Sequence, residues 1–184
     1  MWQIEVMWRA TPWAPYGLVA ALLVAVLAAR PLARRGQTST VGAGLWLALM
    51  GVIVTLTLTP GLSPMVHRQC GLVVTGLPSP AELLSLRERA LNVWMYVPVA
   101  LLAVLPRQRR TRVTALAAAA ALPIVAEVAQ WAIPALGRQC QLPDLVENLA
   151  GVAMGAAVGL AVHRFAGLAA PWRRGGVAEI RTGE

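Results

Sequence analysis

The sequence contains no lysine, and acidic residues are scarce. All 16 basic residues are arginines, against 8 Asp and Glu in 184 residues, which gives a formal charge of +8. Such a charge is compatible with nucleic-acid binding, but the arginines are clustered between long apolar runs and do not form one basic face. That distribution is typical of membrane topology, so we predict no nucleic-acid partner.

Familiar catalytic and cofactor motifs are also missing. The chain has no GxSxG, HExxH, P-loop or dinucleotide-binding motif, so an enzymatic activity is left open and no cofactor is predicted. Only Cys70, Cys140 and one suitably placed histidine, His67, are available for a zinc site. Because zinc usually takes four such ligands, we predict no metal site.

Hydrophobic residues dominate what is present. They make up 58% of the chain, and the mean hydropathy is +0.63, values outside the range of soluble globular proteins. Without water in the bilayer core, each long apolar run must be a helix or part of a barrel, and strict alternation is lacking. We predict an all-α polytopic transmembrane bundle of about five spans, at residues 14–30, 41–60, 90–106, 113–133 and 145–163.

Arginine placement predicts the orientation of this bundle. Residues on one side of the predicted spans would carry Arg30, Arg34, Arg35, Arg107, Arg109, Arg110, Arg112, Arg164, Arg173, Arg174 and Arg181. The positive-inside rule therefore places the N-terminus outside and the C-terminus in the cytoplasm. Trp94, Tyr96 and Trp131 would anchor the outer interface, where amphipathic rings are favoured.

A polar pair shares one helical face with a glycine stripe in the fifth run. Asp144, Asn148, Gly151, Gly155 and Gly159 fall within an arc of about 80° on a helix. The GxxxGxxxG pattern lets another helix approach closely, so this face is predicted to turn into the bundle. Helix packing alone is the alternative explanation of the glycines.

The fourth run contains an acid, Glu127, about one turn from the outer boundary. A charged group there is costly unless it faces protein or trapped water, and Gln130 shares its helical face. Both faces would converge near Arg138, which we expect to pair with an acid or to hold a phosphate. The expected acid partners are Asp144, Glu147 and Glu127.

These positions define the candidate site. The candidate catalytic residues are Glu127 and Asp144, and the candidate ligand-binding residues are Gln130, Arg138 and Asn148. The alternative is a structural cluster in which these groups only satisfy one another.

The two predicted outer loops contain further features. Cys70 and Cys140 occur in HRQC and GRQC, and a disulfide would tie the long loop over the polar site, with two free thiols as the alternative. Ser79, Pro80 and Glu82 form a capping box that predicts a short interfacial helix. Its Leu83, Leu84 and Leu86 would lie against lipid, with Arg87, Glu88 and Arg89 in the headgroup layer.

The combined pattern resembles a known family. Glu127-x-x-Gln130, Gly137-Arg138 and Asp144-x-x-x-Asn148-x-x-Gly151-x-x-x-Gly155 look like the signature of the VanZ-like family of bacterial integral membrane proteins. TLTLTP at 55–60 and NVWMYVP at 92–98 are similar to further family patterns, which adds Asn92 to the ligand-binding candidates. Pro143 stands where the family often has an acid, which argues against a two-carboxylate or metal role there.

The resemblance implies both a domain organisation and a function. Residues 1–40 would be an extra transmembrane helix with its connection, 41–163 the VanZ-like four-helix core, and 164–184 a disordered cytoplasmic tail. The family implies a cell-envelope protein linked to glycopeptide (teicoplanin) resistance. We hypothesise an outer-facing polar site that binds or processes a phospholipid or a lipid-linked cell-wall precursor.

Two alternatives of other classes stay open. One is a non-catalytic membrane scaffold in which the polar cluster only fixes helix packing. The other is a small transporter, which is less favoured because the sequence has no inverted repeat. A homo-oligomer is compatible with all three hypotheses.

Overall fold

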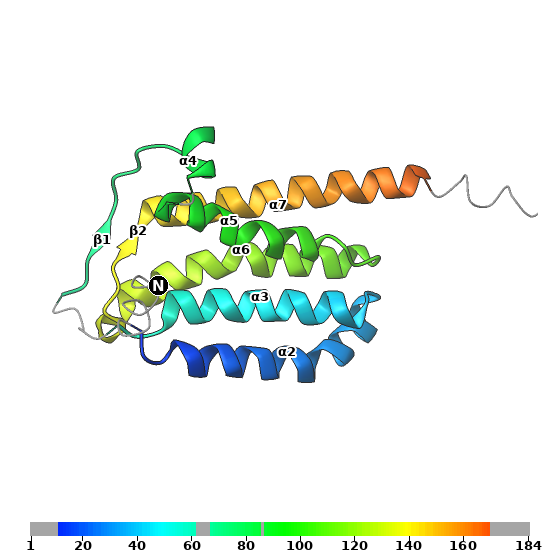
Figure 1. The fold of residues 1–184 in the computed structure, drawn as a ribbon, viewed down its shortest axis with the longest axis horizontal. Coiled ribbons are helices and arrows are strands. Elements are labelled where there is room, and N and C mark those ends of the chain that lie inside the picture. The colour runs from blue at the N-terminus through cyan, green and yellow to red at the C-terminus, as the bar shows by residue number, and fades with distance from the viewer. Residues whose placement is uncertain (1–10, 62–66, 86, 170–184) are drawn as a thin grey trace, which may run out of the picture.

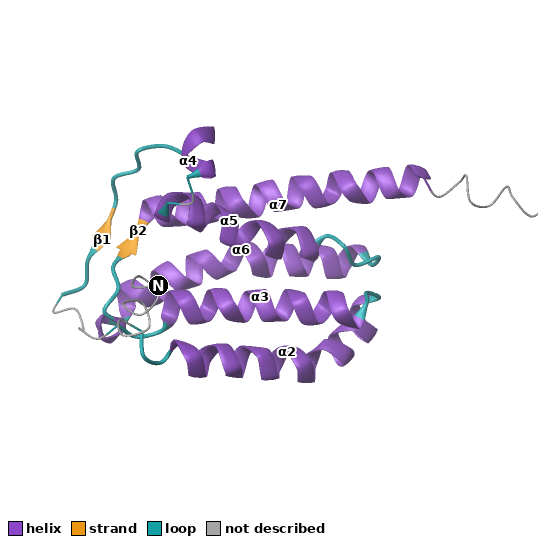
Figure 2. Ribbon diagram, viewed as in Figure 1, coloured by secondary structure: helices purple, strands orange, loops and turns teal. Residues whose placement is uncertain are grey.

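The computed structural model describes residues 11–61, 67–85 and 87–169, with side chains described as far as residue 165. It is mostly helical (Figures 1 and 2). The predictions for residues 1–10, Leu86 and 170–184 lie outside the described residues. In chain order the elements are α2 (Ala14–Gly36), α3 (Thr40–Leu58), β1 (Cys70–Gly71), α4 (Pro80–Leu84), α5 (Glu88–Ala103), α6 (Arg109–Ala132), the 3-10 helix η1 (Pro134–Leu136), β2 (Cys140–Gln141) and α7 (Leu142–Ala169).

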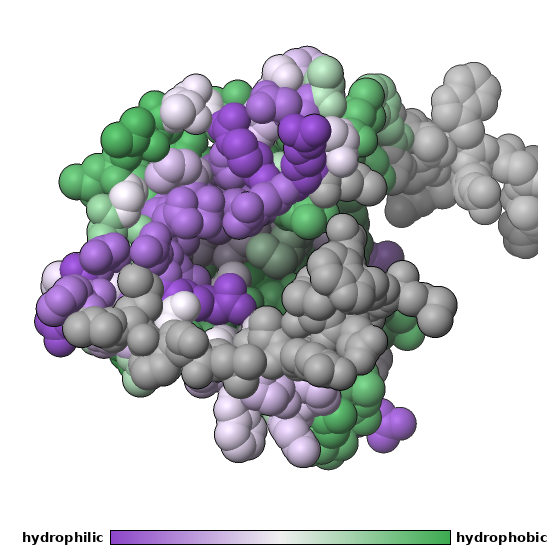
Figure 3. All heavy atoms as spheres, turned by 60° about the vertical axis from the view of Figure 1, so that its left-hand side comes forward, coloured by the Kyte–Doolittle hydropathy of each residue, from purple (hydrophilic) through white to green (hydrophobic). Residues whose placement is uncertain are grey.

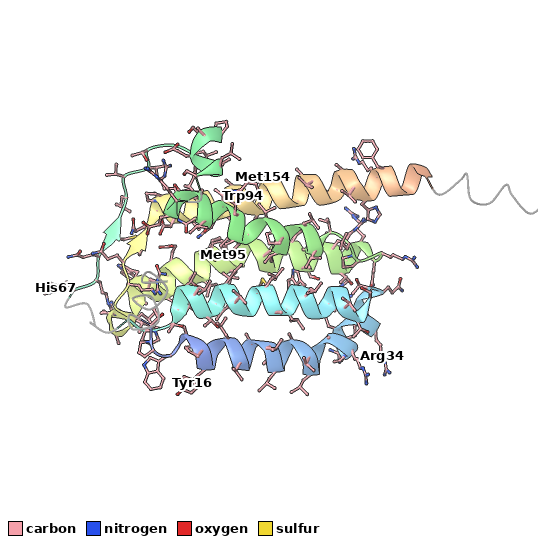
Figure 4. All side chains as sticks on the ribbon, viewed as in Figure 1. Tyr16, Arg34, His67, Trp94, Met95 and Met154 are labelled. Atoms are coloured by element: carbon pink, nitrogen blue, oxygen red, sulfur yellow. A yellow bond between two sulfur atoms is a disulfide. The ribbon has the colours of Figure 1, made fainter. Side chains whose placement is uncertain are left out.

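The five long helices run up and down in one bundle. The turns after α2 and α5 lie at one end, and the loops that contain β1, α4, η1 and β2 lie at the other (Figure 1). Figure 4 labels Arg34 at the first end and His67 at the second. We call the first the arginine end, defined by Arg30, Arg34, Arg35, Arg107, Arg109, Arg110, Arg112 and Arg164. The second is the acidic end, defined by Glu82, Glu88, Glu127, Asp144 and Glu147.

Four of the helices are long and apolar enough to cross a membrane: α2, α3, α6 and α7. These four helices correspond to four of the predicted spans. Their length and composition are those of transmembrane helices. The remaining predicted span, 90–106, corresponds to α5, which has 16 residues and is shorter than the roughly 20 that a bilayer requires. Its helix ends at Ala103 because Pro106 disfavours helical backbone in the residue before it.

Two helices continue past their predicted ends at the arginine end. Helix α2 reaches Gly36 instead of residue 30, through Pro31, and carries Arg34 and Arg35 in its last turn. Cations are favoured there because they interact well with the helix dipole. Gln37 then ends the helix with left-handed backbone, φ 50°. Helix α7 runs to Ala169, so residues 164–169 of the predicted tail are helical.

The glycine face of α7 lies directly on α5. A Cβ atom added at Gly151 would overlap the backbone oxygen of Val93, and one at Gly155 would overlap that of Val97. At Gly159 the added atom would overlap the side chain of Val104. The absence of side chains at these three positions therefore permits the close approach of the two helices.

The central core joins four helices around a buried tyrosine. Tyr96 packs with Ile53 of α3, Ala119 of α6 and Val152 of α7. Its side chain is 0% exposed, so the prediction that Tyr96 anchors the membrane interface is wrong. Helix α2 forms an outer layer on α3 (Figure 1).

Candidate functional site

The acidic end holds a buried ion pair centred on Glu147 of α7. The Glu147 side chain is 1% exposed. Its Oε1 accepts a hydrogen bond from Arg89 Nε at 2.6 Å, and its Oε2 accepts one from Asn92 Nδ2 at 3.1 Å. Arg89 and Asn92 are three residues apart and share a face of the first turn of α5. Because a buried carboxylate is costly unless it is paired, these two contacts compensate for the burial of Glu147.

Glu127 reaches the chain segment just before α7 from helix α6. Its side chain is 7% exposed, and its Oε2 accepts a hydrogen bond from the backbone N–H of Gln141 at 2.6 Å. Gln141 belongs to β2, which pairs in parallel with β1, and the Cys70–Cys140 disulfide joins the two strands. The segment before α7 is therefore held against Glu127 and is covalently anchored to the long loop.

Asp144 completes the acid cluster. It is half-buried and lies close enough to Glu127, Glu147 and Glu88 to interact with their charges, and the Asn92 amide is also near it. Among the described residues, Arg89 is the only basic side chain in ion-pair contact with an acid of this end. The cluster therefore contains more carboxyl groups than cations.

Two buried polar atoms beside the acids have no hydrogen-bond partner among the described residues. They are the hydroxyl of Tyr96 and Oδ1 of Asn148, whose residues are 0% and 4% exposed. Tyr96 lies close enough to Glu127 to interact with its charge, and Asn148 lies one helical turn after Asp144 on α7. Because buried polar groups are nearly always hydrogen-bonded, these two atoms indicate a place where water or a ligand group is accommodated.

Gln130 and Arg138 bind the end of helix α3. Gln130 Nε2 donates to the backbone oxygen of Thr57 at 3.1 Å, and Arg138 Nε donates to that of Thr59 at 3.3 Å. The last carbonyls of a helix lack donors within the helix, and Pro60 offers no N–H. The two side chains thus cap α3 and hold the α6–α7 connection against it.

Arg138 keeps its two terminal amino groups free of protein partners within the described part of the chain. No carboxylate lies within ion-pair distance there, so the expected pairing with Glu127, Asp144 or Glu147 is not formed. The guanidinium is half-buried, and this burial lowers the pKa of Arg138 from its usual value. A partly desolvated guanidinium without a counter-ion is suited to bind an anionic group through its planar fork.

The long loop ends in the predicted capping box. Ser79 Oγ accepts a hydrogen bond from the Glu82 backbone N–H, and Glu82 Oε2 accepts one from the Ser79 backbone N–H, which starts α4. Leu84 is 82% exposed, as a lipid-facing residue would be. Arg89, which was expected in the headgroup layer, turns its side chain to Glu147 and to the backbone oxygen of Gly76.

Sequence reasoning missed Arg89 and Tyr96 as parts of the site. The spacing of Arg89 and Asn92 signals a shared polar face at the start of α5, but nothing local indicates that Glu147 is their partner. Tyr96 gives no signal, since tyrosine is common both at interfaces and in cores.

Hydrophilic side chains gather around a recess at the acidic end (Figure 3). The described residues include no group of three or more His, Cys, Asp or Glu side chains that could hold a metal ion. No family model, curated protein or solved structure matches the chain.

Proposed function

We propose that the acidic end binds the polar head of an amphiphilic cell-envelope component, such as a phospholipid or a lipid-linked cell-wall precursor. The observation that carries this proposal is the pair of orphaned buried atoms, the Tyr96 hydroxyl and Asn148 Oδ1, beside the carboxylates. A polar cluster that served only packing would be expected to satisfy its own members, because unmet buried groups destabilise a fold.

Each candidate residue has a role in this proposal. Arg138 would hold an anionic group through its free amino groups, and Asn92 and Asn148 would orient the head by hydrogen bonds. Gln130 would contribute its amide oxygen, since its nitrogen caps α3. If a reaction takes place, Glu127 or Asp144 would accept the proton.

The proposal includes the location of the site. Arginines at the opposite end favour the cytoplasmic side for that end, and a disulfide at the acidic end fits an oxidising exterior. The acidic end would then face outward from a bacterial plasma membrane. Membership of the VanZ-like family and a link to teicoplanin resistance rest on the sequence resemblance.

Lipids that copurify with the gently extracted protein test the binding site. Mass spectrometry of the parent chain should detect a retained envelope lipid that is lost from Arg138→Ala. Arg87→Ala removes an exposed arginine at the same end and should retain the lipid. The proposal fails if no lipid is enriched in the parent, or if both variants lose it equally.

Neutralising the acids tests whether the site is functional. Glu127→Gln and Asp144→Asn should abolish lipid retention and any effect of the protein on teicoplanin susceptibility. Membrane abundance should stay unchanged, because both substitutions keep the size of the side chain. An equal loss of abundance would favour a structural role.

A non-catalytic scaffold is the second candidate. It is favoured by the close packing of Gly151 and Gly155 on α5 and by the capping of α3 by Arg138. In that case Gly151→Leu should remove the cellular effect, whereas Glu127→Gln should leave it intact.

A further inference from the structure

A cavity of about 800 Å³ lies at the arginine end, between the α2–α3 hairpin and the α5–α6 hairpin. Small residues from three helices line it, among them Gly42, Ala43, Ala103 and Ala115. Because these side chains fill little space, the two hairpins leave a void where they meet. Its volume is within the range of small-molecule sites, roughly 300 to 1,000 Å³.

The wall of this cavity is mainly apolar, and polar groups come from the turns and the first turns of the helices beside it. Leu32, Leu102 and Leu105 supply apolar surface, while Ser39, Thr111 and Arg107 supply polar groups. The lining also includes Trp46, whose indole N–H is buried and has no acceptor among the described residues. This combination suits a molecule with a hydrocarbon chain and a polar head that carries oxygen acceptors.

The arginines around the cavity favour a negatively charged head group. The described residues of the arginine end include no Asp or Glu, and Arg107 and its neighbours Arg109 and Arg110 are exposed. Basic pockets between membrane helices recognise anionic lipid heads in this way. A free inorganic anion would leave the apolar wall without a partner.

We propose that this cavity binds an anionic phospholipid, with an acyl chain against Leu102 and Ala115 and the phosphate at Arg107. This cavity is separate from the acidic end, so its lipid binding can be tested independently of the function proposed above. An ester oxygen of the lipid would be the acceptor that the Trp46 indole lacks.

Quenching of Trp46 fluorescence by brominated lipids tests this site directly. In a variant in which the other six tryptophans are Phe, brominated phosphatidylglycerol should half-quench Trp46 at about a fivefold lower mole fraction than brominated phosphatidylcholine, as one close arginine implies. A matched variant that keeps only Trp13, which is exposed beside the outer helix α2, reports on bulk lipid and should show no preference. Equal half-quenching of Trp46 by the two lipids would overturn the proposal.

Paired arginine variants identify the head-binding residue. Arg107→Gln should bring the preference of Trp46 for phosphatidylglycerol down to about twofold or less. Arg164→Gln removes the same charge at the same end from an exposed position outside the cavity, and it should keep the fivefold preference. Equal reductions in the two variants would show only general attraction to the arginine end, which contradicts the site.

Filling the cavity provides a test that keeps all seven tryptophans. Native mass spectrometry of the chain with Ala115→Phe should lose the retained phosphatidylglycerol. Ala117→Phe, on the exposed face of the same helix, should retain it. Retention by both variants, or no retained phosphatidylglycerol in the parent chain, would exclude the proposed site.

Discussion

The two ends of the bundle accommodate charge in opposite ways. At the acidic end, Glu127 and Glu147 are buried, and each accepts hydrogen bonds from other segments of the chain. At the arginine end, Arg34, Arg107 and Arg164 are exposed. Buried charge requires several elements to meet around it, whereas exposed charge requires only water and lipid heads. Removing one partner of the ion pair at the acidic end should therefore destabilise the fold, whereas removing an exposed arginine at the other end should alter only contacts with lipid.

The largest expected effect comes from the helix contact that brings the acidic end together. Gly155→Leu should lower the free energy of unfolding by more than about 3 kcal/mol, because the new side chain would displace the backbone of Val97. Thermal unfolding in detergent is the measurement. Ala153→Leu, on the exposed face of the same helix, should change the stability little; equal effects would mean that α5 does not pack on this face.

Removing Arg89, which pairs with Glu147 at the acidic end, should have the next largest effect. Arg89→Met leaves Glu147 buried without a cation and should cost about 3 kcal/mol, at the low end for buried pairs, since the Arg89 side chain is 35% exposed. Arg87→Met is the exposed control. The double variant Arg89→Met/Glu147→Met should recover much of the loss. If Arg89→Met and Arg87→Met had similar stabilities, the ion pair of Arg89 with Glu147 would not stabilise the fold more than an exposed arginine does.

Loss of the disulfide should have an intermediate effect. Cys70→Ser/Cys140→Ser opens a loop with a sequence separation of 70 residues and should cost about 2 kcal/mol. This loss of stability is smaller than the loss expected for a water-soluble protein with a loop of the same length. The reason is that helices inserted in a bilayer already restrict the conformations of the unfolded state. In intact cells, a maleimide that does not cross the membrane should label these cysteines only after reduction. Labelling that needs a membrane-permeant reagent would put the acidic end on the cytoplasmic side.

The smallest effect is expected at the exposed capping box. The backbone N–H of Ser79 holds the pKa of Glu82 below its usual range. A carboxyl with a lowered folded-state pKa stabilises at pH values above its unfolded-state pKa, near 4.3, and this stabilisation is lost as the pH falls through the folded-state value. The protection factor for hydrogen exchange at residues 81–84, which corrects the observed rate for the slower intrinsic exchange in acid, should therefore fall in acid. In Glu82→Gln the acid-dependent component should be absent; an unchanged pH dependence would contradict the assignment.

The features that sequence reasoning predicted correctly are local ones. The apolar runs of α2, α3, α6 and α7 and the Ser79 capping box depend on residues close together in the chain. The end of α5 was misjudged because its apolar run continues to residue 106, beyond the last helical residue, Ala103. Hydrophobic composition predicts a helix as far as residue 106, but Pro106 disfavours helical backbone just before it.

The partners of the charged groups could not be predicted in the same way. Arg89 and Glu147 are 58 positions apart, and Arg138 and Thr59 are 79 apart. Each group had several candidate partners in sequence, and only the packing of α7 on α5 and of the 133–141 connection on α3 selects one. The cavity at the arginine end likewise depends on how two hairpins meet.

By itself, the sequence determined that this chain forms apolar helices with arginines concentrated at one end, and that α7 carries its glycines on one face. Hydrophobicity and helical periodicity are properties of short segments, so they can be recognised without knowledge of tertiary contacts. Only the tertiary structure decided that Arg89 pairs with Glu147, that Tyr96 is buried beside Glu127, and that Arg138 caps α3. Those outcomes depend on contacts between segments that are distant in the sequence. Only the packing of the helices brings these segments within hydrogen-bond distance.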